Sequence, residues 1–500
     1  MTASIGRAFK SARRWPHKSP ALSKIVDNEK PPVIDMAHFE PLGAWSTDKL
    51  KSSQESNPFM LTRIPGRGRE SIPHISHGDG IYLIDVEGKK YIDWTSQAIC
   101  SNLGHSLPQS IIESTTHQMQ TLPFLYSGLG IPEVRTRFNQ LMNEILPGDL
   151  CAAVFPSSGA EANEAGIMMA RRYTGRHKVM SWYRSYHGAT AGAAITTGDF
   201  RRWYGREQNS GFIKAFSPFP LFWQVGGDTE EERVQMSLNM LEEQILNEGP
   251  ETIASIVMES IVGAGGCLIM PPGYMQGVRA ICDKYGILMH LDEIMVGFGR
   301  TGKLFGFQHY EGVMPDIVSM AKGISAASVP MSMTACSKHI LDHFEDSPLG
   351  WGSTYQAHAV AMACSYESVK YLIQNNIVDK VKKMAPAFKD NMARLAASHP
   401  SIKQYRAIGL FGCFDVHEVD GSNPKLQHKA LPDAFLKYKK AYAKNGLIGL
   451  HRYPHIHVAP PLIINQEELH DGFDRHDHAL YTLDEALGHD RIDLPLPVTA

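Results

Sequence analysis

The sequence of 500 residues has no apolar run long enough to cross a bilayer. It also lacks a strong excess of one charge, since 49 Lys and Arg face 52 Asp and Glu and leave a net charge of −3. We therefore expect neither nucleic acid nor a membrane surface as its main partner. Its seven cysteines are odd in number and have no CxxC spacing, which favours a reducing, intracellular compartment.

The first 26 residues lack acids altogether, because none appears before Asp27. Basic residues and serines are frequent there, as in a mitochondrial transit segment. A disordered basic tail is the alternative, because Pro16 and Pro20 would interrupt a helix. The compartment expected is thus the cytoplasm or the mitochondrial matrix.

The composition, 43% hydrophobic and 20% charged, is that of a globular protein too long for one small core. Residues up to about 70 have an irregular pattern, with proline, glycine and serine frequent from Pro58 to Gly78, and a helical region starts after Gly352. We expect an N-terminal arm with the start of a small domain at 1–70, a large domain at 71–345 and a small C-terminal domain at 346–500.

Strand and helix patterns alternate through the middle of the chain, after a hairpin pattern at 80–94. The alternation predicts an α/β fold with a mostly parallel sheet and helices on both faces. The strands are expected at 151–155, 178–182, 254–259, 286–292 and 316–321, and two of the helices at 161–173 and 273–285.

Polar residues stand where several of these strands end. Open parallel sheets bind ligands beyond the carboxyl ends of their strands, so these residues are the first candidates for a site. They are Ser157, Ser158, Glu259, Asp292 and Lys322.

The segment 155–163 (FPSSGAEAN) predicts a strand, a turn of small residues and a helix that Ser158 and Glu161 cap. Gly159 and Ala160 would let a phosphate approach the free N–H groups of that helix start. A well-capped helix without a ligand is the other interpretation.

Asp292 and Glu293 end an apolar strand, and alternation points their side chains to opposite faces. They are therefore not a catalytic pair. A buried Asp needs a cationic partner, such as a protonated pyridine nitrogen. The glycines from Gly297 to Gly302 imitate nucleotide-binding loops, but Leu304 replaces the Ser or Thr of a P-loop, and no clean helix follows.

Lys322 directly follows another apolar strand. An apolar site lowers the pKa of lysine, which suits an amine that forms a Schiff base. By itself, a lysine reaching from the sheet edge to water explains the pattern as well. An anion-binding turn, an aspartate and this lysine together supply what pyridoxal 5′-phosphate (PLP) requires.

From about Gly80 to beyond Pro461, the chain resembles the class III aminotransferases of PLP fold type I. The motifs are SSGAEANE, SYHGAT, ESIVGAGG, LDEIMVGFGRTG, MAKGIS, GSTYQAH and APPLII. The resemblance implies that Lys322 forms the Schiff base and that Asp292 bonds the ring nitrogen. Ile294 would pack on one ring face and Tyr186 on the other, with His187 of the same motif also at the cofactor.

The resemblance further implies that Ser158, Gly159 and Ala160 hold the phosphate, with Thr354 from the second subunit of a homodimer. Glu259 would take part on the substrate side. Arg452 is similar to an arginine that grips a substrate carboxylate, and Ile99 would set the width of the pocket.

Three residues depart from the family pattern. Ala160 stands where many members have Ser, and Met295 where many have Gln beside the ring oxygen. Ile99 stands where related ω-transaminases often have a bulky aromatic residue, and the stretch after Arg452 is shorter than usual.

The reaction expected is transamination between an amine or ω-amino acid and a 2-oxo acid, either pyruvate or 2-oxoglutarate. A PLP-dependent isomerase, a decarboxylase and a non-catalytic PLP-binding protein are the alternatives. No metal is expected: the histidines among residues 470–478 lie in a polar helical stretch, and the alternating His455 and His457 are expected to face solvent from a strand.

Overall fold

The computed structural model describes residues 46, 48, 49, 73–205, 211–219, 226–416 and 432–490. The chain divides into two units, residues 1–59 and 60–500. In the first, residues 48 and 49 are helical, and the N–H of Lys49 donates to Oγ of Ser46. The basic N-terminal stretch and most of the predicted arm lie outside the described residues. The elements named below all belong to the second unit.

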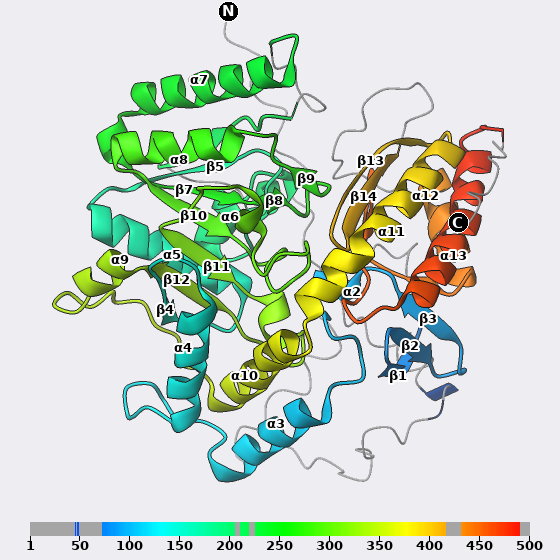
Figure 1. Ribbon diagram of the computed structural model, residues 1–500, viewed down its shortest axis with the longest axis horizontal. Helices are drawn as coiled ribbons and strands as arrows, with labels where there is room; N and C mark the ends of the chain where they lie inside the picture. Colours follow the sequence, from blue (N-terminus) through cyan, green and yellow to red (C-terminus); the bar gives the residue numbers. More distant parts are fainter. Residues whose placement is uncertain are drawn as a thin grey trace, which may run out of the picture. The chain divides into compact units, whose positions relative to one another are not determined.

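A seven-stranded sheet, on the left in Figure 1 and called the central sheet below, has the strand order β4-β12-β11-β10-β7-β5-β6. Its paired strands run parallel, except that β12 is antiparallel to both β11 and β4. The predicted mostly parallel sheet is confirmed. The strands are β4 (Leu150–Val154), β5 (Lys178–Trp182), β6 (Phe212–Ala215), β7 (Ile253–Glu259), β10 (Leu288–Asp292), β11 (Ile317–Met320) and β12 (Met333–Ser337).

Helices α5 (Gly159–Thr174) and α8 (Tyr274–Tyr285) confirm the two helices predicted between strands. Gly166 of α5 lies so close to His290 of β10 that a Cβ would stand 2.4 Å from the imidazole ring. This tight contact lets α5 cover the face of β10 to which His290 and Asp292 point. The other helices of this region are α2 (Ser96–Ile99), α3 (Gln109–Thr121), α4 (Glu133–Ile145), α6 (Ala191–Thr196), α7 (Glu230–Glu248) and α9 (Lys338–His343).

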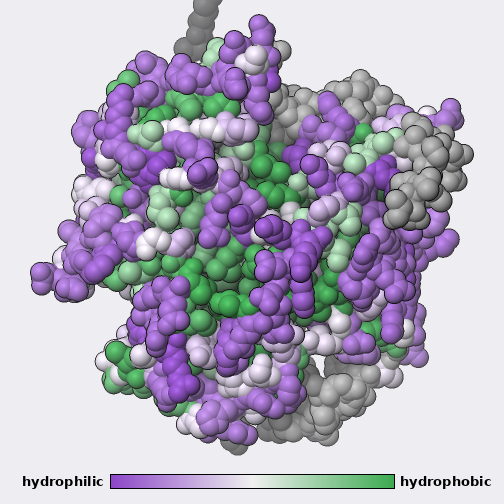
Figure 2. Space-filling view, in the orientation of Figure 1, coloured by the Kyte–Doolittle hydropathy of each residue, from purple (hydrophilic) through white to green (hydrophobic). Residues whose placement is uncertain are grey.

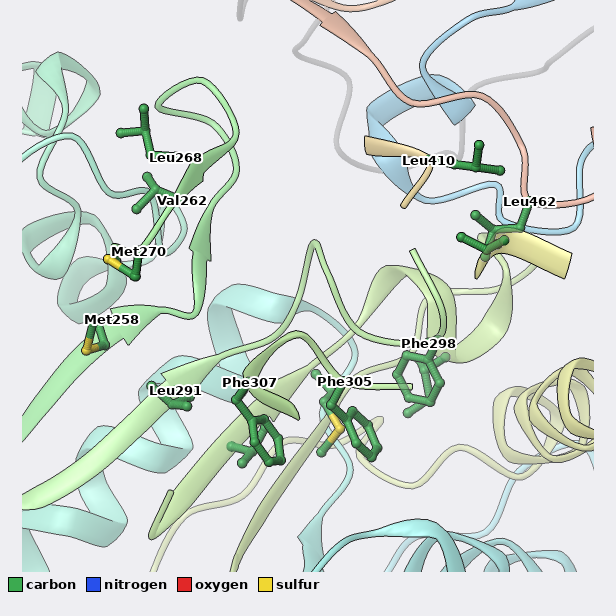
Figure 3. Close-up of a cluster of buried hydrophobic side chains, with 14 of the residues drawn as sticks. Met258, Val262, Leu268, Met270, Leu291, Phe298, Phe305, Phe307, Leu410 and Leu462 are labelled. Atoms are coloured by element: carbon green, nitrogen blue, oxygen red, sulfur yellow. The ribbon is translucent and has the colours of Figure 1, made fainter. Parts of the chain in front are cut away.

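Apolar side chains from the segment after β10 fill the space beneath the strand ends (Figure 3). Phe298, Phe305 and Phe307 form a row, with ring centroids 5.9 and 5.8 Å apart. All three are almost fully buried. The chain that follows Asp292 is therefore anchored in the core, which fixes where the strand delivers its carboxylate. Short elements complete this region: β8 (Ile261–Val262), β9 (Leu268–Ile269) and the 3₁₀ turns η4 (Phe200–Gly205), η5 (Pro250–Thr252), η6 (Gly306–His309) and η7 (Lys322–Ser325).

A four-stranded antiparallel sheet, β13-β14-β17-β16, lies in the C-terminal part together with long helices. A third sheet joins the predicted hairpin to the C-terminal part, because β15 pairs in parallel with β3. The division at residues 70 and 345 stays a prediction. The elements are β1 (Ile75–Asp79), β2 (Tyr82–Asp85), β3 (Lys90–Asp93), α10 (Ala359–Gln374), α11 (Ile377–Ser398), β13 (Ile402–Ile408), β14 (Phe411–Val416), α12 (Asp433–Lys444), β15 (Leu447–Ile448), β16 (His451–Arg452), β17 (His455–Val458) and α13 (Gln466–Ala486).

Among the described residues, every helix is too short or too polar to serve as a bilayer span.

Candidate active site

Three predicted site residues meet at the carboxyl edge of the central sheet. Asp292 ends β10 and lies beside Glu259, the last residue of β7, and beside Ser319 of β11. Lys322 follows three residues after Ser319, so the parallel register carries it to the same edge. The electrostatic influence of Asp292 and Glu259 on Lys322 agrees with this placement.

Asp292 is 3% exposed, and three hydrogen bonds hold its carboxylate. Oδ2 accepts from Nδ1 of His187 and from Nδ2 of Asn163, both at 2.8 Å. Oδ1 accepts from the N–H of Ile294 at 3.0 Å. Because a carboxylate can only accept, Nδ1 of His187 carries the proton of that bond.

Glu293 points away from this group, as predicted. Its carboxylate accepts from Oγ of Ser260 and from the N–H groups of Gly306 (2.6 Å) and Phe307 (2.9 Å). Burial raises its pKa to about 7. Glu293 therefore supports the chain that turns back after β10 and takes no part in the site.

Lys322 begins the 3₁₀ turn η7 with φ at 45°, which few residues other than glycine adopt. Such strained backbone is often found at functional sites. Removal of the amine from water, followed by the nearby positive charge of Arg452, lowers its pKa to about 8. Near neutral pH, the fraction of molecules with a neutral amine is therefore much larger for Lys322 than for an ordinary lysine.

Glu259 is 4% exposed, and its two oxygens accept from the N–H of Tyr186 (3.0 Å) and of Gly263 (2.7 Å). Burial raises its pKa to about 7. The hydrogen bond to Tyr186 joins the end of β7 to the predicted SYHGAT motif. Glu259 is thus a group that can hold or release a proton near neutral pH.

Two guanidinium groups lie against Tyr186. Cζ of Arg201 is 3.5 Å from the ring centroid, and Cζ of Arg452 is 5.8 Å from it. Arg452 belongs to β16, so the C-terminal sheet reaches the ring of Tyr186. Arg201 was not predicted.

The start of α5 has the predicted capping box. Oγ of Ser158 accepts from the N–H of Glu161, whose carboxylate accepts from the N–H of Ser158. A Cβ on Gly159 would stand 2.7 Å from Ile294, and one on Gly188 would stand 2.5 Å from Cβ of Ala160. The helix start therefore lies against both Ile294 and the SYHGAT motif, and the first N–H groups of a helix have no acceptor within it.

Ile99 and Thr354 differ in position. Ile99 is 2% exposed, at φ 58°, and belongs to a buried cluster with Ile261 and Val296, against which Met295 packs. Thr354 is exposed in the turn before α10, and no hydrogen bond joins it to the site among the described residues. Ile99 thus lies in the interior of the subunit and Thr354 at its surface.

The glycine-rich segment 297–302 forms consecutive turns, and a short 3₁₀ turn rather than an α-helix follows. Its Arg300 is fully buried and bonds the carbonyl oxygens of Leu410 and Pro460, Oγ of Ser96 and Oδ1 of Asn102. Burial lowers its pKa to about 9. Through Arg300, the segment joins the chain after β10 to the residues before β14 and after β17.

The expectation that His455 and His457 face solvent is wrong, because both are 1% exposed. Strand β17 lies between β14 and β16, and both side chains turn inward. Nδ1 of His455 bonds Asp415 at 2.7 Å, and Nε2 of His457 donates to the carbonyl oxygen of Gly263 at 3.0 Å. The sequence pattern could not reveal the loop that covers this face.

In the described residues, the one cluster with metal-ligand geometry is Cys413, Asp415 and His455. Arg406 already donates to both oxygens of that carboxylate, at 2.9 and 2.7 Å. The guanidinium of Arg406 thus already binds the carboxylate that a metal ion would need as a ligand. His476 of α13 is also buried, between Trp94 and Tyr438.

Sequence reasoning missed Asn163 and Arg201. Asn163 lies on the buried face of α5, where the other buried residues are apolar or glycine. A lone amide on an apolar face was a usable signal. Arg201 lies in a short 3₁₀ turn without periodicity, so no pattern marked it.

A family model described as aminotransferase class-III matches residues 66–480. The γ-aminobutyrate transaminase 1, mitochondrial, of Oryza sativa subsp. japonica is 32% identical over 412 residues, 79% of each chain. The taurine–pyruvate aminotransferase of Bilophila wadsworthia is 31% identical over 356 residues, 68% of this chain and 76% of its own.

Solved structures agree with this relationship. The taurine:2-oxoglutarate aminotransferase of Bifidobacterium kashiwanohense, in complex with PLP and glutamate, has a TM-score of 0.82 and 34% identity, over 89% of this chain and 99% of its own. An (S)-enantioselective ω-transaminase of Thermomicrobium roseum has a TM-score of 0.81 and 32% identity, over 88% and 99%. The chain belongs to the class III aminotransferases.

Proposed function

We propose that this aminotransferase uses PLP to move an amino group between an amine or ω-amino acid and a 2-oxo acid, either pyruvate or 2-oxoglutarate. The observation that carries the proposal is a lysine amine of lowered pKa at the same sheet edge as Asp292 and Glu259. A related structure that holds PLP and glutamate supports the choice of cofactor.

The residues present fit such a cofactor. The start of α5, with Ser158, Gly159 and Ala160, offers N–H groups for a phosphate. Asp292 offers a carboxylate for a protonated ring nitrogen, and His187 and Asn163 keep that carboxylate in place.

Ile294 would pack on one face of the cofactor ring, and Tyr186 would stack on the other. Ile294 lies against the helix start, next to the proposed phosphate site. Arg201 covers one face of Tyr186, so the opposite face would meet the ring. The side chain of Met295 cannot donate a hydrogen bond to the ring oxygen of the cofactor. It packs against Gly263, whose N–H donates to Glu259.

PLP, when bound, supplies an electron sink for the substrate carbon that loses its proton. Lys322 would first hold the cofactor covalently and then, once displaced by the donor amine, serve as the general base that moves this proton. The lowered pKa keeps a useful fraction of the amine neutral for both tasks. Asp292 would hold the ring in its protonated form, so that the charge developed on the carbon is stabilised.

Glu259 would contribute on the substrate side. Its pKa of about 7 lets it change charge within the working range, while the N–H groups of Tyr186 and Gly263 fix its position. Arg452, next to Tyr186, would attract a substrate carboxylate. Ile99 would shape the pocket through Ile261 and Met295.

We further propose a homodimer in which Thr354 enters the partner's site. Thr354 lies next to Tyr355, which is 61% exposed, and the ring of Tyr355 contacts Phe124 at 5.6 Å. The chain between α3 and α4 also exposes Leu129 (80%) and Ile131 (71%). Figure 2 shows hydrophobic residues at the surface over this chain, at the lower left. Large exposed apolar groups in one area are typical of a protein interface.

Sedimentation would test the dimer, and Leu129→Asp should weaken it. Thr354→Ala should lower the affinity for PLP without changing the oligomeric state. A monomer at micromolar concentration that is fully active would contradict both statements.

Of the two compartments expected, we propose the mitochondrial matrix, because a rice relative is mitochondrial and the N-terminal segment is basic and free of acids. A fluorescent protein fused to residues 1–40 should then enter mitochondria. A cytoplasmic signal would favour the alternative.

The central experiment is a donor panel with purified holoenzyme. ¹⁵N-labelled amines and ω-amino acids are offered with pyruvate or 2-oxoglutarate, and transfer of the label to the acceptor is measured. We expect label in alanine or glutamate. Conversion of the donor without an acceptor would indicate an isomerase instead, and released carbon dioxide a decarboxylase.

A further inference from the structure

Two arginines lie near the ring of Tyr186, and Arg201 is the nearer of them. Its Cζ lies 3.5 Å from the ring centroid, against 5.8 Å for Arg452. The N–H of Tyr186 bonds Glu259, and Arg452 acts on Lys322, so Arg201 is linked to this group of residues through its contact with Tyr186.

One edge of the Arg201 guanidinium is already occupied. Nε donates to both oxygens of Asp199, at 3.0 and 2.8 Å, and Nη2 donates to the same carboxylate. Asp199 also accepts the N–H of Arg201 at 2.9 Å. The side chains are 17% and 5% exposed, so the pair is held firmly in a mostly buried position.

The remaining nitrogen is not satisfied. Nη1 of Arg201 is buried and has no hydrogen-bond partner within the described part of the chain. A buried donor without an acceptor is unfavourable, and guanidinium groups suit carboxylates and similar anions. The missing acceptor is therefore expected from a bound molecule.

The charges around Tyr186 favour an anion. Arg201 and Arg452 face the ring, and Lys322 is close enough to Arg452 to feel its charge. Asp199 neutralises much of Arg201 but leaves Nη1 free to donate. Arg201 can thus serve an acid group of a substrate through Nη1.

We propose that Arg201 binds the acid group of the substrate that is remote from the reacting carbon, a carboxylate or a sulfonate. The enzyme then prefers acid-bearing donors to neutral amines of the same length. This inference rests on the proposed function, because it assigns a residue to the substrate of that reaction.

Matched donors test the proposal: 4-aminobutyrate against butylamine, and taurine against ethylamine. Each is assayed with the acceptor, pyruvate or 2-oxoglutarate, that the wild type uses faster. In Arg201→Gln, kcat/KM for the acid-bearing donor should fall about tenfold to a hundredfold, chiefly because KM rises. A loss of this size corresponds to one charge-assisted hydrogen bond. For the neutral amine kcat/KM should change less than about twofold, since no acceptor is lost.

Arg202→Gln is the matched control, because it removes the same charge one residue away. Arg202 donates to the carbonyl oxygens of Gly198 and Asp199 and lies over Tyr183. The donor preference of this variant should equal that of the wild type. Arg201→Lys, which keeps the charge but loses the planar fork, should fall between wild type and Arg201→Gln.

Calorimetric titration of the holoenzyme with butyrate measures the same contact without turnover. Its affinity should fall in Arg201→Gln and stay unchanged in Arg202→Gln. Equal losses for acid-bearing and neutral donors, or unchanged butyrate affinity, would overturn the role of Arg201 while leaving transamination intact. A wild type that transfers no label from any donor would defeat the proposed function instead, and the butyrate titration would still decide on Arg201.

Discussion

Nδ1 of His187 donates to Oδ2 of Asp292 at 2.8 Å, and both side chains are closed off from water. Asn163 donates to the same oxygen, and the N–H of Ile294 donates to the other. Three donors thus hold both oxygens of this carboxylate. Asp292 is therefore oriented before any ligand arrives.

The two adjacent carboxylates should respond to substitution in opposite ways. Asp292→Asn should retain some cofactor but lower kcat about 10²-fold or more, because the charge that develops in the reaction loses its partner. Glu293→Gln should keep kcat close to that of the wild type. It should instead lower the free energy of unfolding by about 1–3 kcal/mol, because one of its buried N–H partners loses its acceptor.

Steady-state rates and denaturant unfolding of both variants separate the two effects. Near-wild-type turnover in Asp292→Asn would remove it from the reaction. A loss of kcat in a stable Glu293→Gln would place the wrong carboxylate at the cofactor.

Replacing Lys322 should eliminate the reaction. Lys322→Ala removes both the covalent attachment and the general base, and the base alone is typically worth a factor on the order of 10² to 10⁴. We expect no measurable turnover and no absorbance of a lysine-linked cofactor. Lys322→Arg is the control, since it keeps a positive charge but cannot form the link. Turnover in either variant would contradict the assignment.

Five of the seven strands of the central sheet could be predicted from the sequence, and so could the residues that lie at its carboxyl edge. Strands β6 and β12 were not predicted. Apolar strands that end in Glu259, Asp292 and Lys322 are local patterns, and parallel pairing brings strand ends together whatever the rest of the chain does. The cap at Ser158 was equally local, because its partner lies three residues away.

The errors and omissions concern contacts between distant segments. His457 seemed exposed because alternation shows one face of a strand and not what covers it, here the loop that contains Gly263. Arg201 reaches Tyr186 through an irregular turn that no periodicity predicts. Thr354 would act in the site of a partner subunit, and contacts between subunits leave no periodic pattern in the sequence of one chain.

Arg300 should be needed for stability. Its four partners include the carbonyl oxygens of Leu410 and Pro460, which are far away in the sequence. Arg300→Met should lower the free energy of unfolding by about 3 kcal/mol or more, since each buried acceptor left unsatisfied costs about 1–3 kcal/mol. Arg300→Lys should lose less, because an ammonium keeps some of these bonds.

Thermal and denaturant unfolding measure the effect of Arg300. Addition of ATP or NAD should leave the wild-type Tm unchanged, as the turn structure of residues 297–302 implies. A mild effect of Arg300→Met, together with stabilisation by a nucleotide, would restore the nucleotide interpretation.

The pKa of Lys322 should govern how fast the apoenzyme captures PLP. Only the neutral amine attacks an aldehyde, so the rate of covalent attachment should rise with pH and level off above about 8, far below the ordinary lysine value of 10.5. Stopped-flow absorbance of the cofactor measures this rate.

A substitution of Arg452 tests why the pKa of Lys322 is lowered. After burial, the positive charge of Arg452 is the next contribution that lowers the pKa of Lys322, because a nearby cation disfavours the protonated amine. Arg452→Gln should therefore move the midpoint of the capture rate to higher pH and slow capture at pH 7. Lys439→Gln, a lysine replaced on α12, is the control and should leave the midpoint in place. A midpoint that is the same in wild type and Arg452→Gln would mean that the guanidinium does not act on the amine, and Arg452 would lose its place beside the reacting group.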